Sequence, residues 1–310
     1  MDKPTGLSRA AFLIGAASAA VMLGSGPWRT PAFAAAQPLS ERLVGKSRDG
    51  LKLPVIGLGT RSMSKSDAKA VAGQGEVIAT LLDGGGKLID TAANYTGGDS
   101  EEVIGQALAA KGWRKDAFLV TKFGERGKDA GVRSMENSFK SLQTDVIDVM
   151  FVHNMIDIPT QLPNIKEYKA KGRIKYVGIS DTGRNQDELI KYLDDIDFVE
   201  FAYAGDSREA EARLLPACRD KGVSVLVALP LGRGRALSAV KGQDVPEWAR
   251  KELGVETFAQ LLLKFVIGHP AVTVAIPSTL NPHHMAENVA AGRGPLPDEK
   301  QRAKIAQIWA

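Results

Sequence analysis

The sequence is poor in the residues that build disulfides and metal centres. Its single cysteine, Cys218, excludes a disulfide within the chain, and its apolar, helical surroundings predict core packing. Only four histidines occur, and none stands in a His-x-His or multi-carboxylate cluster. His283 and His284 are adjacent, and neighbouring side chains on a helix point about 100° apart, so they make a poor chelate. The sequence therefore predicts no metal centre and disfavours a metal-dependent hydrolase.

The sequence also lacks a strong charge excess. It has 40 basic and 36 acidic residues, a net charge of +4, which falls to +2 without residues 1–34. Aromatic residues make up 6% of the chain and do not interleave with a basic stripe. We therefore expect no nucleic acid among its partners.

The N-terminal segment has no apolar run long enough to cross a membrane. The run from Ala10 to Leu23 has about 14 residues, whereas a bilayer core of about 30 Å needs about 20. A basic start precedes this run, and Ala32 and Ala34 precede a small-residue cleavage point, which is the layout of a secretory signal peptide. We expect residues 1–34 to be that signal and residues 35–310 to be one domain, exported to the periplasm.

Two alternatives stay open for this segment. It could remain as an uncleaved buried or anchoring helix, and the protein would be cytoplasmic if the signal did not function. The stretch SRAAFL, residues 8–13, resembles the twin-arginine export motif but has Ala10 in place of the second arginine. The export route therefore stays open.

What the sequence does contain is eight short apolar runs that alternate with helical patterns. The runs are rich in Val, Ile, Leu and Phe, as buried parallel strands are. The predicted strands cover residues 54–60, 87–91, 117–122, 146–153, 174–180, 197–203, 223–230 and 272–278. The predicted helices cover residues 100–112, 129–144, 162–172, 185–195, 211–222 and 255–269, the first of them with Ser100 as its cap.

This alternation predicts a (β/α)₈ TIM barrel, which typically needs about 250 residues. The competing fold is an open doubly wound sheet, but GLGTRS after the first strand lacks its glycine-rich fingerprint. We expect an N-terminal extension, residues 41–52, to form a hairpin that closes the bottom of the barrel. A tail helix should follow Pro297, and no second domain is expected.

Polar residues stand where the predicted strands end, which is where a barrel of this kind carries its chemistry. Asp90, Lys122 and His153 end successive runs, 32 and 31 residues apart, and Tyr95 follows in the loop after Asp90. Singly, each has a structural explanation, such as a turn cap or a surface lysine. Together they converge on one mouth, and a buried lysine and carboxylate each cost several kcal/mol unless they are paired.

This grouping predicts proton transfer by the phenol. A phenol has an ordinary pKa near 10, and a neighbouring ammonium lowers it. We predict that Lys122, held by Asp90, lowers the pKa of Tyr95 and makes it a general acid toward a carbonyl oxygen, or the base in reverse. His153 would orient the substrate oxygen and share the proton.

With these residues in this order, the sequence resembles the aldo-keto reductase superfamily over nearly all of residues 35–310. The segments that carry the resemblance are LIDTAANY, SEEVIGQAL, FLVTKFG, TDVIDVMFVHN, GRIKYVGIS and IPSTLNPHHMAEN. The segment that begins DFVEFAYAGDSREAEARL further resembles a bacterial branch whose members carry export signals. The resemblance implies an oxidoreductase that transfers hydride between a nicotinamide cofactor, NADP or NAD, and a small aldehyde, ketone or sugar lactol.

The resemblance also implies which residues hold that cofactor. Ser180, with Asp181 and Glu200 beside it, would hold the nicotinamide carboxamide. The stretch Pro230 to Gly234, with Leu231, Gly232 and Arg233, would approach the pyrophosphate. Ser278, His284, Glu287 and Asn288 would receive the adenosine end.

Some of these positions depart from the family pattern. Asp181 replaces an asparagine, Glu200 replaces a glutamine, and no aromatic residue ends the seventh strand. Ser278 and His284 replace a lysine and an arginine, so we expect little preference for NADP over NAD. Two acids at the ring would favour the oxidised, cationic nicotinamide. The alternative is that Asp181 caps the following helix and Glu200 faces a lysine or arginine.

A second hypothesis is a non-enzymatic module that binds a nucleotide for sensing on the same barrel. Weakened cofactor contacts favour it, whereas the complete set of four polar residues favours the enzyme. The loops at residues 61–66, 154–160 and 233–250 contain no decisive pocket residue, so the sequence predicts neither the substrate nor the oligomeric state. Trp248 and Trp309 either line the pocket or pack in the core.

Overall fold

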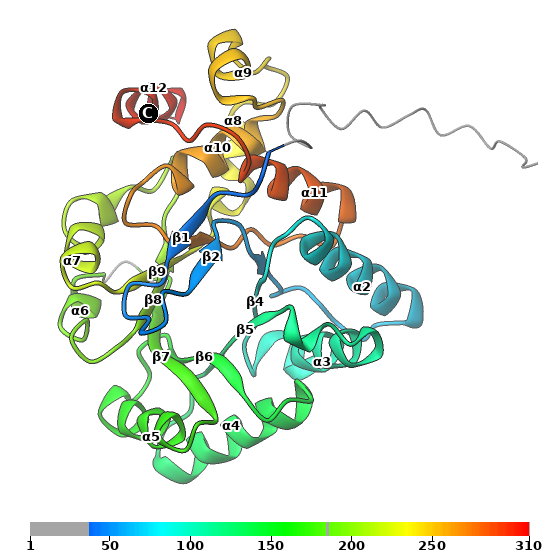
Figure 1. The fold of residues 1–310 in the computed structure, drawn as a ribbon, viewed down its shortest axis with the longest axis vertical. Coiled ribbons are helices and arrows are strands. Elements are labelled where there is room, and N and C mark those ends of the chain that lie inside the picture. The colour runs from blue at the N-terminus through cyan, green and yellow to red at the C-terminus, as the bar shows by residue number, and fades with distance from the viewer. Residues whose placement is uncertain (1–36, 184–185, 310) are drawn as a thin grey trace, which may run out of the picture.

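Eight parallel strands form the centre of the molecule, and helices surround them (Figure 1). The computed structural model describes residues 37–183 and 186–309. The strands are β3 (Leu58–Gly59), β4 (Leu88–Asp90), β5 (Phe118–Phe123), β6 (Ile147–His153), β7 (Ile174–Asp181), β8 (Phe198–Ala202), β9 (Ser224–Ala228) and β10 (Val274–Ala275). Each overlaps one predicted run, and each pairs with its neighbour in sequence order, so the predicted barrel is confirmed.

The first and last strands close the ring. Ile56 and Ala275 form a parallel bridge, as do Gly59 and Ser278. The Gly57 amide donates to the Ala275 carbonyl at 2.9 Å, and the Ala275 amide donates to the Val55 carbonyl at 2.9 Å. Closure leaves the sheet without the unpaired edges that an open sheet presents.

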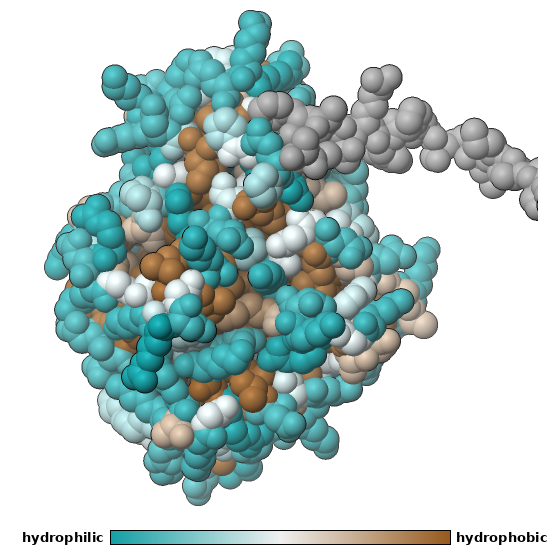
Figure 2. All heavy atoms as spheres, viewed as in Figure 1, coloured by the Kyte–Doolittle hydropathy of each residue, from teal (hydrophilic) through white to brown (hydrophobic). Residues whose placement is uncertain are grey.

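A hairpin covers the N-terminal end of the barrel, as predicted. It consists of β1 (Glu41–Leu43) and β2 (Lys52–Pro54), which pair antiparallel and lie across the front of the barrel in Figure 1. Val44 and Leu53 from this hairpin join the apolar cluster inside the barrel, which includes Leu88, Phe118 and Phe198. Figure 2 shows the same face, with hydrophilic residues over the helices at the rim and apolar residues gathered towards the centre.

The helices pack on the outside of the strands and enclose the larger apolar core. They are α2 (Ala68–Asp83), α3 (Asp99–Lys111), α4 (Lys128–Ser141), α5 (Ile158–Ala170), α6 (Gln186–Ile190), α7 (Leu214–Asp220), α8 (Arg235–Ala239), α9 (Glu247–Leu253), α10 (Phe258–Ile267), α11 (Pro282–Ala291) and α12 (Glu299–Ala306). The six predicted helices and the tail helix are present. Cys218 is buried on α7, where burial raises the pKa of its thiol to about 12.

Several details of the helices differ from the prediction. Helices α2, α8, α9 and α11 were not predicted, and α5 begins four residues earlier than expected. In α2 the apolar pattern is interrupted by Gly73 and Gly75, although Asp67 caps the helix by accepting from the Ala70 amide at 2.8 Å. Helix α3 begins one residue earlier than expected, with Gly98 at its N-cap. Ser100 is therefore not the cap but a buried hydroxyl inside the first turn.

The expected signal peptide, residues 1–34, lies outside the described residues. Within residues 37–183 and 186–309, none of the helices has the length and apolar character needed to cross a bilayer.

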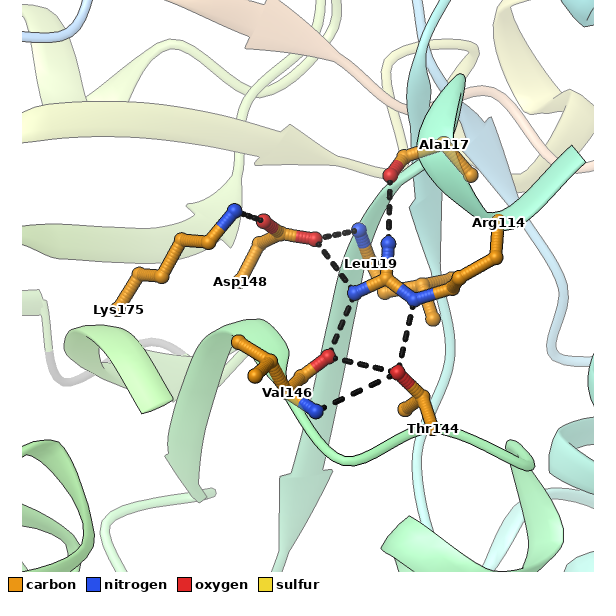
Figure 3. Close-up of polar contacts among 7 residues, drawn as sticks. All are labelled: Arg114, Ala117, Leu119, Thr144, Val146, Asp148 and Lys175. Atoms are coloured by element: carbon orange, nitrogen blue, oxygen red, sulfur yellow. Dashed lines mark hydrogen bonds and ion pairs between the residues drawn. The ribbon is translucent and has the colours of Figure 1, made fainter. Parts of the chain in front are cut away.

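A polar cluster ties the starts of three strands together at the N-terminal end of the barrel (Figure 3). Asp148 on β6 is almost fully buried and accepts from the Leu119 amide at 2.8 Å, from Arg114 at 3.2 Å and from Lys175 at 2.7 Å. Arg114 also donates to the carbonyls of Ala117 and Val146. The cluster fixes the register of β5, β6 and β7 and so positions the residues at their opposite ends.

We predict opposite effects for alanine at two helical glycines. A Cβ at Gly105 on α3 would lie 2.1 Å from the Ser141 carbonyl oxygen, so Gly105→Ala should destabilise the fold by about 1–3 kcal/mol. At Gly73 on α2 nothing lies within 4 Å, so Gly73→Ala should stabilise it by about 0.5–1 kcal/mol. Denaturant unfolding of both variants measures the two effects, and equal effects would contradict this close approach of α3 and the end of α4.

Candidate active site

A cavity of about 640 Å³ opens at the C-terminal ends of the strands. Its lining includes three of the four predicted catalytic residues, Asp90, Tyr95 and His153. The fourth, Lys122, lies beneath the cavity with no exposed side-chain surface. The structure therefore brings all four together, from three successive strands and the loop after the first of them.

Lys122 contacts two carboxylates, not one. Its Nζ pairs with Asp90 Oδ2 from the neighbouring strand β4 and lies 2.9 Å from Glu200 Oε2, which comes from β8 across the barrel. It also donates to the Thr91 carbonyl at 3.1 Å. The side chains of Asp90 and Glu200 are each only 3% exposed, so this ion cluster is almost completely shielded from water.

Buried hydroxyls hold the backbone that presents Asp90. The Thr60 hydroxyl donates to the Asp90 carbonyl at 2.8 Å, and the Thr60 amide donates to it at 3.0 Å. The Ser100 hydroxyl lies 2.9 Å from the hydroxyls of both Thr60 and Thr91. This network joins the ends of β3 and β4 to the first turn of α3, and it explains why Ser100 is buried.

Tyr95 begins a short 3-10 turn, Tyr95–Gly98, directly above Lys122. The Lys122 Nζ lies 5.8 Å from the centroid of the Tyr95 ring, and the His153 ring meets that ring edge-on at 6.0 Å. Three consecutive residues after the tyrosine, Thr96 to Gly98, have positive φ. The two glycines make this sharp turn possible, and it points the phenol back over the barrel mouth.

The charges of the ion cluster shift the pKa values of its members. Burial, and then repulsion from the Glu200 carboxylate, raise the pKa of Asp90 well above its usual range, although Lys122 opposes them. Burial alone would lower the pKa of Lys122, but the two carboxylates raise it above its ordinary value. Lys122 is therefore charged at neutral pH.

The pKa of Tyr95 moves in the opposite direction to the one predicted from the sequence. Burial raises it to about 12; Lys122 opposes this shift, and the carboxylates of Asp90 and Glu200 reinforce it. Burial also lowers the pKa of His153 to about 4, with further lowering by the charges of Lys122 and Arg61. At neutral pH the cavity therefore presents a protonated phenol beside a neutral imidazole.

The predicted cofactor residues fall into two groups. Six of the ten line the cavity, and these are Ser180, Glu200, Leu231, Arg233, Ser278 and His284. Four do not line it, and these are Asp181, Gly232, Glu287 and Asn288. Asn288 is buried, and Gly232 lies within the loop whose neighbours Leu231 and Arg233 line the cavity. A role for the second group in cofactor binding stays a prediction.

Glu200 follows the structural alternative that the sequence left open, because it faces Lys122, whereas no contact of Asp181 with the following helix is seen among the described residues. The Asp181 carboxylate turns to its own loop and accepts from the Gly183 amide at 2.9 Å. Successive side chains of a strand point to opposite faces, so Ser180 faces the cavity and Asp181 does not. Glu200 does line the cavity, but it faces Lys122. A place for Asp181 beside the nicotinamide ring has no support from its contact with the Gly183 amide and stays a prediction.

Several cavity residues were missed by the sequence analysis. Arg61 and Ser62 follow β3, and Asn154 follows β6; all three line the cavity, although their loops were expected to hold no decisive residue. The Arg61 guanidinium lies 5.8 Å from the Tyr95 ring centroid. The rule that found His153, a polar residue where a strand ends, would also have found Arg61 had it been applied one residue beyond the first strand.

Three other predictions concern residues away from the strand ends. Trp309 packs on Phe258 and donates to the Ala236 carbonyl, and neither it nor Trp248 lines the cavity. The ligand-capable atoms of His283, His284 and Glu287 lie within 4.8 Å of one another on α11. The two imidazoles therefore diverge less than adjacent histidines were expected to, and both are exposed.

A second cavity of about 680 Å³ adjoins the first. The two share Asn94, His153 and Asn154 in their linings, and the second continues between α3 and α4 past the buried Glu101. The Glu101 carboxylate accepts from the Thr121 hydroxyl at 2.6 Å, and burial raises its pKa. This cavity is lined mainly by amides, hydroxyls and charged groups.

Comparison with known proteins matches a family model described as the aldo/keto reductase family to residues 55–310. An aryl-alcohol dehydrogenase of Pestalotiopsis microspora is 29% identical over 202 residues, 57% of this chain and 52% of that protein. The aldo-keto reductase YhdN of Bacillus subtilis is 31% identical over 203 residues, 60% of each chain. The alignments thus span about half to three fifths of the length of these curated relatives.

Solved structures match over more of the chain. An aldo-keto reductase from Klebsiella pneumoniae in complex with NADPH has a TM-score of 0.74 and 29% identity, covering 87% of this chain and 96% of that chain. The holo form of an aldo-keto reductase from Bacillus halodurans has a TM-score of 0.72 and 25% identity, with the same coverage.

We predict that loss of the buried ammonium destabilises the protein in a pH-dependent way. Lys122→Met leaves two buried carboxyl groups without a cation, which typically costs about 3–5 kcal/mol. Protonation relieves this repulsion in the folded variant, so the gap in unfolding free energy between wild type and variant should be small at pH 4 and grow towards pH 8. Denaturant unfolding across this range measures the gap.

Lys264→Met is the matched control. The Lys264 ammonium is also buried but bonds to the carbonyls of Arg293 and Pro295, each at 2.7 Å, and burial lowers its pKa to about 8. The difference in unfolding free energy between wild type and Lys264→Met should stay constant between pH 4 and 7, because the Lys264 ammonium remains charged over this range. If the difference for Lys122→Met is equally constant with pH, Lys122 does not neutralise the carboxylates of Asp90 and Glu200 as described.

Proposed function

Because the chain belongs to the aldo/keto reductase family, we propose that it is an NAD(P)-dependent oxidoreductase that interconverts small carbonyl compounds and alcohols. The observation that carries this proposal is the convergence of Tyr95, Lys122 and His153 on one cavity above a buried counter-charge. The curated relatives are matched over only about half to three fifths of their length, and the geometry of the site is the main support. The relatives are named as reductases or dehydrogenases, and none of these names supports the non-enzymatic sensing module.

The cavity has features that fit a nicotinamide dinucleotide. The Ser180 hydroxyl lines the cavity, is buried, and has no hydrogen-bond partner among the described residues, so it is available to a carboxamide. The loop after β9 turns sharply, with positive φ at Leu229 and through Gly232, Arg233 and Gly234. Its small residues permit close approach of a pyrophosphate, and the exposed Arg233 adds a cation.

Tyr95 is suited to give a proton to a carbonyl oxygen. A bound nicotinamide would supply or accept the hydride at the carbonyl carbon. The raised pKa keeps the phenol protonated at neutral pH, and the Lys122 ammonium below the ring stabilises the phenolate that forms when the proton leaves. Asp90 and Glu200 keep that ammonium charged and fixed, so little reorganisation is needed.

His153 orients the substrate and does not supply the proton. Its pKa near 4 leaves the imidazole neutral, so one ring nitrogen donates a hydrogen bond and the other accepts. A neutral donor beside Tyr95 directs the substrate oxygen towards the phenol.

We also propose that residues 1–34 act as an export signal and that the protein works in the periplasm. The support is the basic start, the short apolar run and the small residues before Ala35. An exported enzyme of this kind must carry its cofactor with it or meet a recycling partner.

We expect Tyr95→Phe to lower kcat by about 10²–10⁴-fold, because the variant has no proton to give to the carbonyl oxygen. The dissociation constants of the nicotinamide nucleotides should stay close to wild type. Absorbance at the nicotinamide band with a panel of aldehydes, ketones and sugar lactols measures the rate. Tyr192→Phe removes a hydroxyl outside the cavity lining and should leave the rate unchanged. A Tyr95→Phe enzyme with more than about half the wild-type rate would refute the assignment.

We expect dissociation constants for NADP and NAD that agree within about tenfold. An arginine fork or a lysine holds a 2′-phosphate best, and Ser278 and His284 offer neither. Arg293, a cation that follows α11, donates to the carbonyls of Gln37 and Gly84 and so is not placed to replace them.

The matched variant is His284→Arg, which should shift the preference towards NADP. Fluorescence titration of both nucleotides at pH 8 decides the matter. A wild-type preference for NADP of about 100-fold or more would show that another cation, Arg61 or Arg233, holds the phosphate.

A further inference from the structure

Glu200 gives the cavity floor an unusual charge balance. One ammonium, on Lys122, faces two carboxylates, Asp90 Oδ2 and Glu200 Oε2, and all three side chains are at most 3% exposed. Fully ionised, this triad of Asp90, Lys122 and Glu200 carries one net negative charge in a site nearly closed to water. A single proton on the carboxyl pair makes the triad neutral, which is the cheaper state for a buried cluster.

Glu200 also lines the cavity. Its Oε2 has no hydrogen-bond partner among the described residues beyond the ion pair with Lys122. It pairs in register with Ser180 on β7, whose unbonded hydroxyl lines the same cavity. A ligand that reaches Ser180 therefore comes close to the triad.

The surrounding groups do not supply the missing positive charge. Tyr95 above Lys122 stays neutral, and His153 on β6 is neutral above about pH 4. Phe151 on β6 presents its ring to Lys122 at 5.6 Å. Ala228 at the end of β9 and Ile276 just after β10 add apolar surface to the lining, and the charged or titratable residues that follow these strands, Arg233 and His284, are exposed. Arg61 is charged but exposed, beyond the Tyr95 ring.

We propose that the triad holds one exchangeable proton on its carboxyl pair and releases it when the cationic, oxidised nicotinamide binds. This inference rests on the proposed function. The proton leaves to solvent, so the neutral triad and the cationic ring become a charge-balanced pair. The reduced ring is neutral and releases no proton. Glu200 is thus a positioning residue for Lys122 that favours the oxidised cofactor, and this preference grows as the pH rises.

Proton release on binding tests the proposal directly. Calorimetric titration of NADP⁺ and NAD⁺ in buffers of different ionisation enthalpy counts the protons that leave, between pH 5 and 9. Wild type should release a fraction of a proton that approaches one, and its affinity for oxidised cofactor should rise by up to about tenfold per pH unit. NADPH and NADH should release none. Glu200→Gln, which is isosteric, should abolish the release and make the affinity ratio of oxidised to reduced cofactor independent of pH.

Two further variants and one further measurement complete the test. Asp90→Asn removes the other carboxyl and should also abolish proton release, whereas Asp195→Asn, which changes an exposed carboxylate paired with Lys166, should change nothing. Infrared spectra of the cofactor-free proteins should show a protonated carboxyl band in wild type that is lost in Glu200→Gln. Thermal melting confirms that each variant is folded.

The outcomes separate this inference from the proposed function. Equal proton release in wild type and Glu200→Gln would overturn the role of the triad while leaving the oxidoreductase assignment intact. Failure of all four nucleotides to bind would overturn the proposed function and the coupling with it. The infrared band would then still show whether Asp90 and Glu200 hold a proton.

Discussion

A lysine with no exposed side-chain surface needs compensating charge, and the architecture of this protein supplies it from two directions. Asp90 approaches Lys122 from the adjacent strand, and Glu200 approaches from across the ring. Only a closed barrel brings β4, β5 and β8 around one point. Two polar groups keep those strands in register. The hydroxyl network of Thr60 and Ser100 lies at the C-terminal ends of β3 and β4, and the cluster around Asp148 lies at the opposite ends of β5, β6 and β7. The state of Tyr95 follows, because the same three charged groups and the same burial set its pKa.

The fold was predictable because buried parallel strands leave a strong mark in sequence. Runs such as 146–153 are mostly apolar, and their length and regular spacing fit one strand per barrel unit. Helix α2 was missed because Gly73 and Gly75 weaken its periodicity, while its packing against α11 and α3 depends on tertiary contacts that no local pattern records. The start of α3 was misplaced because Gly98, in a left-handed conformation, takes the place that a serine cap usually holds.

The candidate site was predictable where position alone decides the outcome. Asp90, Lys122 and His153 end neighbouring parallel strands, so their convergence follows from topology. The predictions that did not hold or gained no support depend on the direction in which a side chain points and on how deeply it is buried. Asp181 is adjacent to Ser180 in sequence but points to the other face, and the pKa of Tyr95 rises because of desolvation that the sequence does not display. The ion pair between Glu200 and Lys122 agrees with one of the alternatives from the sequence. That β5 and β8 approach each other, however, becomes clear only from the closed barrel.

Closure of the ring also imposes an order of events on the newly made chain. Ile56 pairs with Ala275, and Arg293 donates to the Gln37 carbonyl across a sequence separation of 256 residues. Such distant pairings carry a large loop-closure entropy and are associated with slow folding. Until β10 has been synthesised, the first strand keeps an unpaired edge that other chains can occupy. The barrel therefore completes late in biosynthesis, and during that interval pairing of the open edge with other chains competes with correct closure.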